Sequence, residues 1–158
     1  LDLASGDGHR TIFLATRGFE VTAVDISDVA LSRLKILAEK QNVSIKLKRL
    51  NLEKPGADIA KHLAAYDNLL IVNYKPATSL WHALSGLVVP GGKILFCTFN
   101  TIQHELTGFS LKFCIEPGSG KTPPPGFELI SYETVREEKK SRDGYVYRRL
   151  LAKGTGTP

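Results

Sequence analysis

Most of what this chain indicates about its chemistry lies in its first 27 positions, which read LDLASGDGHRTIFLATRGFEVTAVDIS. A small-residue loop, Ala4–Gly8, follows a short apolar run and precedes a helical pattern. Gly6 and Gly8 have no Cβ, so the backbone can turn tightly there and a ligand can approach it closely. Asp25 ends the next apolar run, where its carboxylate can accept two hydrogen bonds from a ribose diol. The order of these features predicts a nucleoside-binding strand–helix–strand unit.

The spacing of the glycines indicates which class of nucleoside cofactor the loop could bind. The dinucleotide fingerprint is G-x-G-x-x-G, whose third glycine allows close packing of helix on strand. Here Thr11, with a branched Cβ, stands at that third position. The pattern therefore argues against a dehydrogenase. The alternative without a ligand is an ordinary strand-to-helix turn, with Asp25 a solvated acid at a strand end.

The positioning elements alternate along the chain, which favours a parallel sheet with helices on both faces. Ser27 is expected to cap the second helix. We expect further strands at 45–52, 68–74 and 93–99, and helices at 11–17, 59–65 and 79–87. Strands at 127–133 and 145–152 are joined by a charged connection that ends in Asp143-Gly144, a hairpin signal. We expect one domain over residues 1–153 and a disordered tail over 154–158.

The chain resembles the class I S-adenosylmethionine-dependent methyltransferases, and it is similar to their small tellurite-resistance-type members. The family signature, acid-x-G-x-G-x-G, is matched by Asp2-x-Ala4-x-Gly6-x-Gly8. The resemblance also covers YDNLLIVNY, LVVPGGKILFCTF and the terminal hairpin, so it extends from Leu1 to about Lys153. It implies an α/β, Rossmann-like, doubly wound and mostly parallel sheet, closed by a C-terminal antiparallel hairpin. It also implies that S-adenosylmethionine is the cofactor.

The resemblance implies roles for particular positions. Asp25 would hold the ribose and Ile26 would pack on the adenine, whose amino group Asn51 would bind. Asn73 and Tyr74 would line the mouth where the methyl group is transferred. The full set of expected cofactor-binding residues is Asp2, Ala4, Ser5, Gly6, Gly8, Asp25, Ile26, Asn51, Leu52, Asn73 and Tyr74.

Five departures from the family pattern stand out. Ala4 replaces the first glycine, and Asn51 replaces an acid but keeps a carbonyl that can accept a hydrogen bond. Asn73–Pro76 lacks the two prolines of the amino-group methyltransferases, so it does not indicate an amine acceptor. A Gly/Pro-rich stretch, 118–125, stands where many relatives have a helix. The helix that usually precedes the first strand is also expected to be missing.

No single catalytic residue is indicated. Methyl transfer needs alignment and desolvation of two reactants more than a dedicated base. Four side chains are candidates for the acceptor side: His9, Tyr74, His104 and Glu105. His9 could accept a proton near neutral pH, although a helix-terminal histidine exposed to water is the favoured interpretation.

Composition narrows the functional classes. Hydrophobic residues make up 42% and charged residues 23% of the 158 positions, as in ordinary globular proteins. No apolar run reaches the roughly 20 residues that span a bilayer.

Cys97 and Cys114 have no C-x-x-C spacing, so we expect reduced thiols, no metal site and a cytoplasmic location. Pro117–Thr122 resembles the end of a P-loop, but Ile115 stands where the first glycine belongs and Pro123–Pro125 follows.

Three functions stay open. A small-molecule acceptor is favoured by the single compact domain. The net charge of +5 permits an RNA or protein acceptor, although no aromatic residues interleave the basic clusters as a stacking platform. The departures at Ala4 and Asn51 leave room for a cofactor-binding pseudo-enzyme. Neither the oligomeric state nor the identity of the acceptor follows from the sequence.

Overall fold

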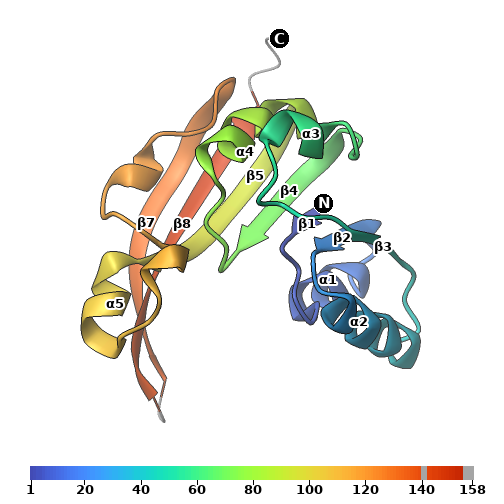
Figure 1. Ribbon diagram of the computed structural model, residues 1–158, viewed down its shortest axis with the longest axis horizontal. Helices are drawn as coiled ribbons and strands as arrows, with labels where there is room; N and C mark the ends of the chain where they lie inside the picture. Colours follow the sequence, from blue (N-terminus) through green and yellow to red (C-terminus); the bar gives the residue numbers. More distant parts are fainter. Residues whose placement is uncertain (140–141, 155–158) are drawn as a thin grey trace.

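One sheet organises the protein, and its strand order is β3-β2-β1-β4-β5-β8-β7, with β6 beside the end of β5. The computed structural model describes residues 1–139 and 142–154, and Figure 1 shows the arrangement. The strands are β1 Asp2–Leu3, β2 Val21–Asp25, β3 Ile45–Arg49, β4 Tyr66–Val72, β5 Val88–Asn100, β6 Cys114–Ile115, β7 Phe127–Lys139 and β8 Arg142–Gly154. The helices are α1 His9–Ala15, α2 Asp28–Lys40, α3 Gly56–Ala60, α4 Thr78–Ala83 and α5 Thr101–Thr107, with short 3₁₀ turns at Leu84–Leu87, Leu111–Phe113 and Ser119–Lys121.

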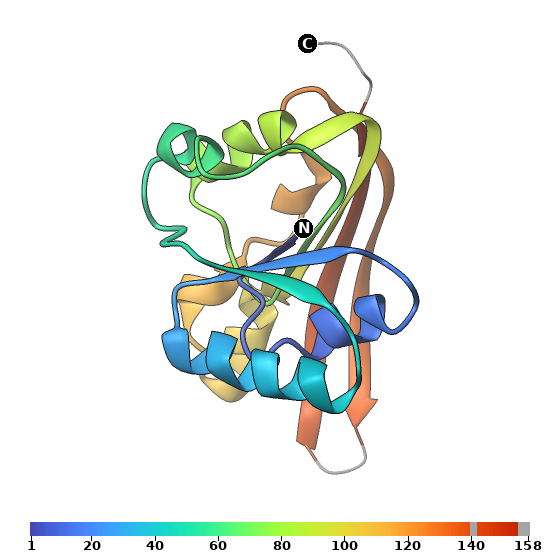
Figure 2. The same cartoon turned by 90° about the vertical axis from the view of Figure 1, so that its right-hand side faces the viewer.

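Strands β1 to β6 pair in parallel, whereas β8 runs antiparallel to both β5 and β7. The predicted fold class, a mostly parallel doubly wound sheet closed by a C-terminal hairpin, is confirmed. The helices cover both faces, because Figure 2 shows α3 and α4 on one side of β2 and β3, and α1 and α2 on the other.

The larger core lies under α3 and α4. Its members are buried apolar side chains of β1, β4 and β5 together with those of the two helices, and Trp81 contacts the ring of Phe96 there with a centroid distance of 5.1 Å. A smaller cluster beneath α1 and α2 joins Ile12, Ala23 and Leu34. Burial of these side chains fixes the two helical layers against the sheet.

Most predicted elements are present with shifted ends. The predicted helix at 11–17 begins two residues earlier, at His9, and ends at Ala15. Ser27 caps α2 as expected, since its side chain accepts a hydrogen bond from the backbone N–H of Ala30 at 3.2 Å. The predicted strand at 45–52 is the edge strand β3 and ends at Arg49.

The hairpin prediction is correct in topology and wrong in the position of the turn. Asp143 and Gly144 lie within β8, and residues 136–139 of the expected charged connection continue β7. Cross-strand pairing evidently outweighs the local turn preference of Asp-Gly, because a long β5–β8–β7 ladder supports both strands. Residues 140–141 and 155–158, which include most of the expected tail, lie outside the described residues, but Gly154 ends β8.

A helix, α5, follows β5, contrary to the expectation that only a Gly/Pro-rich stretch separates β5 from the hairpin. Its signals are present in the sequence. The Oδ1 atom of Asn100 caps it by accepting from the backbone N–H of Ile102 at 3.1 Å, and Gly108 ends it with a φ of +69°. Both views place α5 in the same half of the molecule as α1 and α2.

Candidate functional site

The sheet has a topological switch point between β1 and β4. From β1 the chain proceeds to β2 and β3 on one side, and the later strands β4 and β5 lie on the other. The loops that follow β1 and β4 therefore diverge and leave room at the carboxyl ends of these strands. Ligands of open α/β sheets bind at this position.

The loop after β1 has an unusual backbone. Ala4, Gly6 and Gly8 all have positive φ angles, of +58°, +55° and +77°. Hydrogen bonds from the N–H of Ser5 to the carbonyl of Val24, and from the N–H of Gly8 to the carbonyl of Ser5, hold the turn at 3.1 Å each. The loop is thus rigid without any ligand.

The two glycines of the loop serve different purposes. A Cβ on Gly8 would lie 2.1 Å from the Cδ1 atom of Leu34, a fully buried side chain of α2, so Gly8 permits close packing of the loop on that helix. A Cβ on Gly6 would meet nothing within 4 Å. Gly6 therefore keeps the backbone open toward the space where a ligand can approach.

Asp25 anchors this loop. One carboxylate oxygen accepts from the N–H of Gly6 at 2.8 Å, and the other accepts from the N–H of Ser27 at 2.9 Å. Each oxygen keeps further acceptor capacity, because an ionised carboxylate offers about four lone-pair sites. Asp25 is only partly buried, so a ribose diol can reach those sites.

Asp2 lies beneath the loop. Its side chain is 3% exposed and accepts a hydrogen bond of 2.6 Å from the hydroxyl of Thr11. Burial raises the pKa of the Asp2 carboxyl, and the Thr11 hydroxyl partly offsets that rise. Sequence reasoning missed this partner because it treated Thr11 only as a missing glycine. The expected contact of Asp2 with the cofactor stays a prediction, and the geometry gives Asp2 a supporting role.

The residues expected around the adenine differ in exposure. Ile26, directly after Asp25, leaves 53% of its surface exposed and can pack on a flat ring. The Oδ1 atom of Asn51 accepts from the N–H of Glu53 at 2.9 Å, so one of its two acceptor positions is used. Leu52 is buried in the larger core.

The two residues that follow β4 lie in different environments. Asn73 is exposed and has a φ of +59°, and its N–H donates to the carbonyl of Cys97 at 2.8 Å. Tyr74 is buried, and its hydroxyl lies 3.2 Å from both the carbonyl oxygen of Leu52 and a carboxylate oxygen of Glu53. Burial and the charge of Glu53 raise the pKa of Tyr74. The tyrosine side chain thus links the loops after β3 and β4.

The acceptor-side candidates do not converge. His9 is exposed at the start of α1, and Glu105 is exposed on α5. The Nδ1 atom of His104 lies 2.7 Å from the carbonyl oxygen of Phe109, which ties the ring to its own loop. The described geometry thus singles out no general base.

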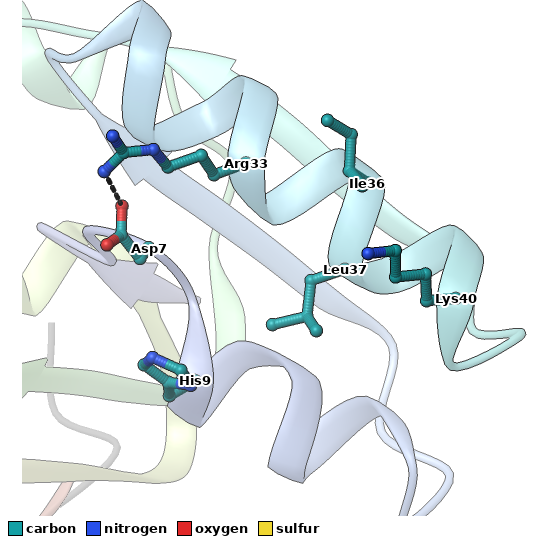
Figure 3. A pocket seen from close by; sticks show the side chains of 6 residues that line it. All are labelled: Asp7, His9, Arg33, Ile36, Leu37 and Lys40. Atoms are coloured by element: carbon teal, nitrogen blue, oxygen red, sulfur yellow. Dashed lines mark ion pairs between the residues drawn. The ribbon is translucent and has the colours of Figure 1, made fainter.

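An open depression of about 290 Å³ lies beside the loop, between α1 and α2 (Figure 3). Asp7 and Arg33 form an ion pair of 3.6 Å at one end, and Leu37 points into the space between the helices. The full lining is Asp7, His9, Arg33, Ile36, Leu37 and Lys40. Neither Gly6 nor Asp25 contributes, so this depression is separate from the site at the strand ends.

The described residues contain neither a candidate metal-binding cluster nor a candidate membrane-spanning helix. No cluster of three or more His, Cys, Asp or Glu side chains that could hold a metal is found among them. None of their helices has the length and hydrophobicity of a membrane-spanning segment.

Residues 1–92, more than half of the chain, match the methyltransferase domain family. The chain belongs to this family. The matched segment begins with β1 and contains the loop, Asp25 and the carboxyl end of β4. The resemblance to class I S-adenosylmethionine-dependent methyltransferases is thereby confirmed.

The matches between this methyltransferase domain and its curated relatives cover only part of the length of those proteins. The chain is 31% identical over 101 residues to the ubiquinone biosynthesis O-methyltransferase of Alkalilimnicola ehrlichii, a match that covers 63% of the chain and 41% of that protein. The corresponding protein of Azotobacter vinelandii is 28% identical over 101 residues, which cover 63% of the chain and 44% of the relative. The match thus spans less than half the length of these relatives.

Solved structures share the fold of this methyltransferase domain. TehB from Haemophilus influenzae aligns with a TM-score of 0.76 at 18% identity, over 96% of this chain and 56% of TehB. The magnesium protoporphyrin IX methyltransferase of Synechocystis, solved with bound S-adenosylhomocysteine, aligns with a TM-score of 0.68 at 17% identity, over 96% of this chain and 71% of that one.

Proposed function

We propose that this chain binds S-adenosylmethionine at the carboxyl ends of β1 and β2 and transfers its methyl group to an oxygen atom of a small-molecule acceptor. Membership of the methyltransferase domain family supports the reaction. The names of the curated relatives, O-methyltransferases of ubiquinone biosynthesis, favour a small acceptor with a hydroxyl group. No observation favours an RNA or protein acceptor.

The groups present fit the cofactor. Asp25 offers free acceptor positions for a ribose diol, Gly6 leaves open space beside the backbone, and Ile26 offers an exposed apolar surface for adenine. Among the described residues, the Oγ atom of Ser5 is a buried polar atom without a hydrogen-bond partner. A bound ligand can complete the hydrogen bonding of this hydroxyl, because buried polar groups are normally paired.

The chain's own groups bind and orient the cofactor. When bound, S-adenosylmethionine supplies an activated methyl group. The rigid loop fixes the ligand through Asp25 and the Gly6 backbone, and precise placement of two reactants removes much of the entropic barrier to their reaction. No dedicated base is assigned, because the hydroxyl proton of a phenol-type acceptor can pass to water. The single observation that carries the proposal is the Asp25 carboxylate bonded to the loop beside open space.

Two further proposals accompany this function. We propose that residues 1–153 act as one domain, because one sheet connects the described strands from β1 to β8. We also propose a cytoplasmic location. Cys97 and Cys114 are both buried and have no C-x-x-C spacing, which favours a compartment where thiols stay reduced.

The test is calorimetric titration of S-adenosylmethionine and S-adenosylhomocysteine into the wild type and Asp25→Ala. Loss of charge-assisted hydrogen bonds worth about 1.5–3 kcal/mol each should weaken binding by about 100-fold. Asp28→Ala is the matched control, because Asp28 is an exposed acid that pairs with Arg49 and should leave the affinity unchanged. Equal affinity of wild type and Asp25→Ala would contradict the site.

Turnover is tested separately. Transfer of labelled methyl groups from S-adenosylmethionine is measured with a panel of 3,4-dihydroxybenzoate, benzoate and thiophenol. The proposal expects methylation of an oxygen acceptor. Binding of the cofactor without transfer to any acceptor of the panel would instead support the pseudo-enzyme alternative.

A further inference from the structure

Two buried side-chain polar atoms have no hydrogen-bond partner among the described residues, and they follow two different strands. One is the Oγ atom of Ser5, which belongs to the loop after β1 and is already assigned to the cofactor side. The other is the Nδ2 atom of Asn100, the last residue of β5. Nothing in the cofactor site uses Asn100.

The orientation of the Asn100 amide is fixed by the helix that it caps. Its Oδ1 atom accepts from the N–H of Ile102 at 3.1 Å, so the Nδ2 atom must point away from that N–H. The residue is 1% exposed, so bulk water does not supply a partner. A buried donor without a partner costs about 1–3 kcal/mol, and native proteins rarely keep one without a reason.

A nearby residue of β5 shows that buried polar side chains in this part of the strand can find hydrogen-bond partners. Thr98, two residues earlier and on the same face of β5, is also fully buried. Its hydroxyl donates to the carbonyl of Phe113 at 3.0 Å. The unpaired donor is therefore specific to Asn100, at the end of the strand.

The position of Asn100 matches the acceptor side of the site. Strand β4 separates β1 from β5, so the strand that precedes Ser5 and the strand that ends at Asn100 are about 10 Å apart at the usual strand spacing. Between them, β4 leads to the exposed Asn73. In Figure 1 the arrowhead of β4 lies between α5, which Asn100 caps, and α1. A cofactor held by the loop after β1 thus leaves the end of β5 for the second reactant.

We propose that the Nδ2 group of Asn100 donates a hydrogen bond to an oxygen atom of the methyl acceptor and so positions that molecule. The inference rests on the proposed function and names the acceptor class: small molecules with an oxygen that can accept a hydrogen bond. Acceptors that present only sulfur gain little from this donor, because sulfur is a weak acceptor.

Asn100→Ser tests the inference, because serine is as good a helix cap as asparagine and lacks the amide donor. We expect kcat/KM for 3,4-dihydroxybenzoate to fall at least about 10-fold, mainly because KM rises. A fall of this size corresponds to the loss of one hydrogen bond. The kcat/KM for thiophenol should change less than about twofold. Affinity for S-adenosylhomocysteine should stay at the wild-type value, and the midpoint of thermal unfolding should not fall, because the variant removes an unpaired buried donor.

Thr98→Val is the matched control. It removes a buried hydroxyl whose partner, the Phe113 carbonyl, is known, so it should lower the unfolding midpoint and leave the ratio of the two acceptors unchanged. Asn100→Ser should thus change the preference between the two acceptors without lowering stability, whereas Thr98→Val should lower stability without changing that preference.

A second readout does not depend on turnover. In ¹⁵N-labelled protein the side-chain NH₂ pair of Asn100 is identified by its absence from the Asn100→Ser spectrum. Adding 3,4-dihydroxybenzoate to the S-adenosylhomocysteine complex should shift this pair.

The outcomes separate the two claims. A wild type that methylates the catechol, with Asn100→Ser equally active or with the NH₂ pair unshifted on binding, overturns the inference alone. A lower unfolding midpoint in Asn100→Ser also overturns it, because the amide would then have a structural partner. A wild type that neither binds the cofactor nor methylates any acceptor overturns the proposed function, and the inference with it.

Discussion

The carboxyl ends of β1 and β2 differ from those of β4 and β5 in how far the protein satisfies its own polar groups. On the first side, Asp2 is bonded to Thr11, and Asp25 is bonded to two backbone N–H groups. On the second side, Asn100 keeps an unpaired donor. The first side also keeps one unpartnered atom, the Oγ atom of Ser5. Its loop is nevertheless held by Asp25 before any ligand arrives, whereas the buried Asn100 amide keeps a donor for a ligand. A fixed site suits a constant cofactor, since preorganisation lowers the cost of binding.

The largest expected effect is on the free energy of unfolding, and it distinguishes the packing role of Gly8 from the role of Gly6 in leaving space for a ligand. Gly8→Ala places a methyl group against buried Leu34 at a φ of +77°, so strain and overpacking together should cost about 3 kcal/mol of unfolding free energy. Gly6→Ala meets open space and should cost only about 1 kcal/mol, from its positive φ. Urea unfolding of both variants measures this difference.

The same pair should reverse order in ligand binding. The new methyl group of Gly6→Ala occupies the open space beside the loop, so affinity for S-adenosylhomocysteine should fall about 10-fold in folded protein, a loss of about 1.4 kcal/mol. Leu34→Ala should relieve part of the Gly8→Ala penalty, because it removes the overlapping atoms. Equal stability losses in the two glycine variants would contradict the assigned roles.

The next effect concerns the buried pair beneath the loop. Thr11→Val leaves the Asp2 carboxylate without its donor and should cost about 2 kcal/mol at pH 7. Burial already raises the pKa of Asp2 in the folded state, and loss of the hydroxyl raises it further. A raised pKa means that stability falls as pH rises from the unfolded value, near 3.9, through the folded value.

The Thr11→Val penalty should therefore be larger at pH 7 than at pH 4, where the carboxyl of Asp2 is increasingly protonated. Urea unfolding at the two pH values measures it. Thr16→Val, at the residue directly after the same helix, is the control, because its exposed hydroxyl donates to the carbonyl of Phe13 and should contribute less than about 0.5 kcal/mol at either pH. A penalty independent of pH would show that Thr11 acts through packing alone.

The smallest effect is expected at Ala4. Its φ of +58° is strained for a residue with a Cβ, but its methyl group packs against the larger core. Ala4→Gly should relieve strain and lose packing, for a net gain of about 0.5 kcal/mol in thermal unfolding. Ala60→Gly in α3 is the contrasting variant and should lose about 1 kcal/mol, because glycine disfavours a helix. A clear loss in Ala4→Gly would mean that the methyl packing outweighs the strain.

Local signals in the sequence predicted much of the first half. Gly6, Gly8 and Asp25 are close along the chain, and their roles follow from backbone freedom and from the end of a short strand. The helix cap at Ser27 is likewise a contact between near neighbours. Such features are readable because they depend on residue types at fixed spacings within one strand–helix–strand unit and the helix start that follows it.

Contacts between distant segments were not predicted. The sequence did not indicate that the hydroxyl of the buried Tyr74 lies 3.2 Å from the carbonyl oxygen of Leu52, and the expected place of Tyr74 at the methyl-transfer mouth stays a prediction. The hairpin turn was placed at Asp143-Gly144, whereas pairing with β5 and β7 carries β8 through both residues. These outcomes depend on which segments the sheet brings side by side.

The sequence by itself determined the family, the strand–loop–helix unit and the carboxylate that can hold a ribose, because each depends on residue type and short spacing. Only the tertiary structure decided which polar groups are satisfied. The hydroxyl of Thr11 on α1 reaches Asp2 on β1, and the Nδ2 atom of Asn100 is buried without a hydrogen-bond partner among the described residues. Burial and hydrogen-bond partners are properties of the packed molecule, so a linear pattern does not contain them.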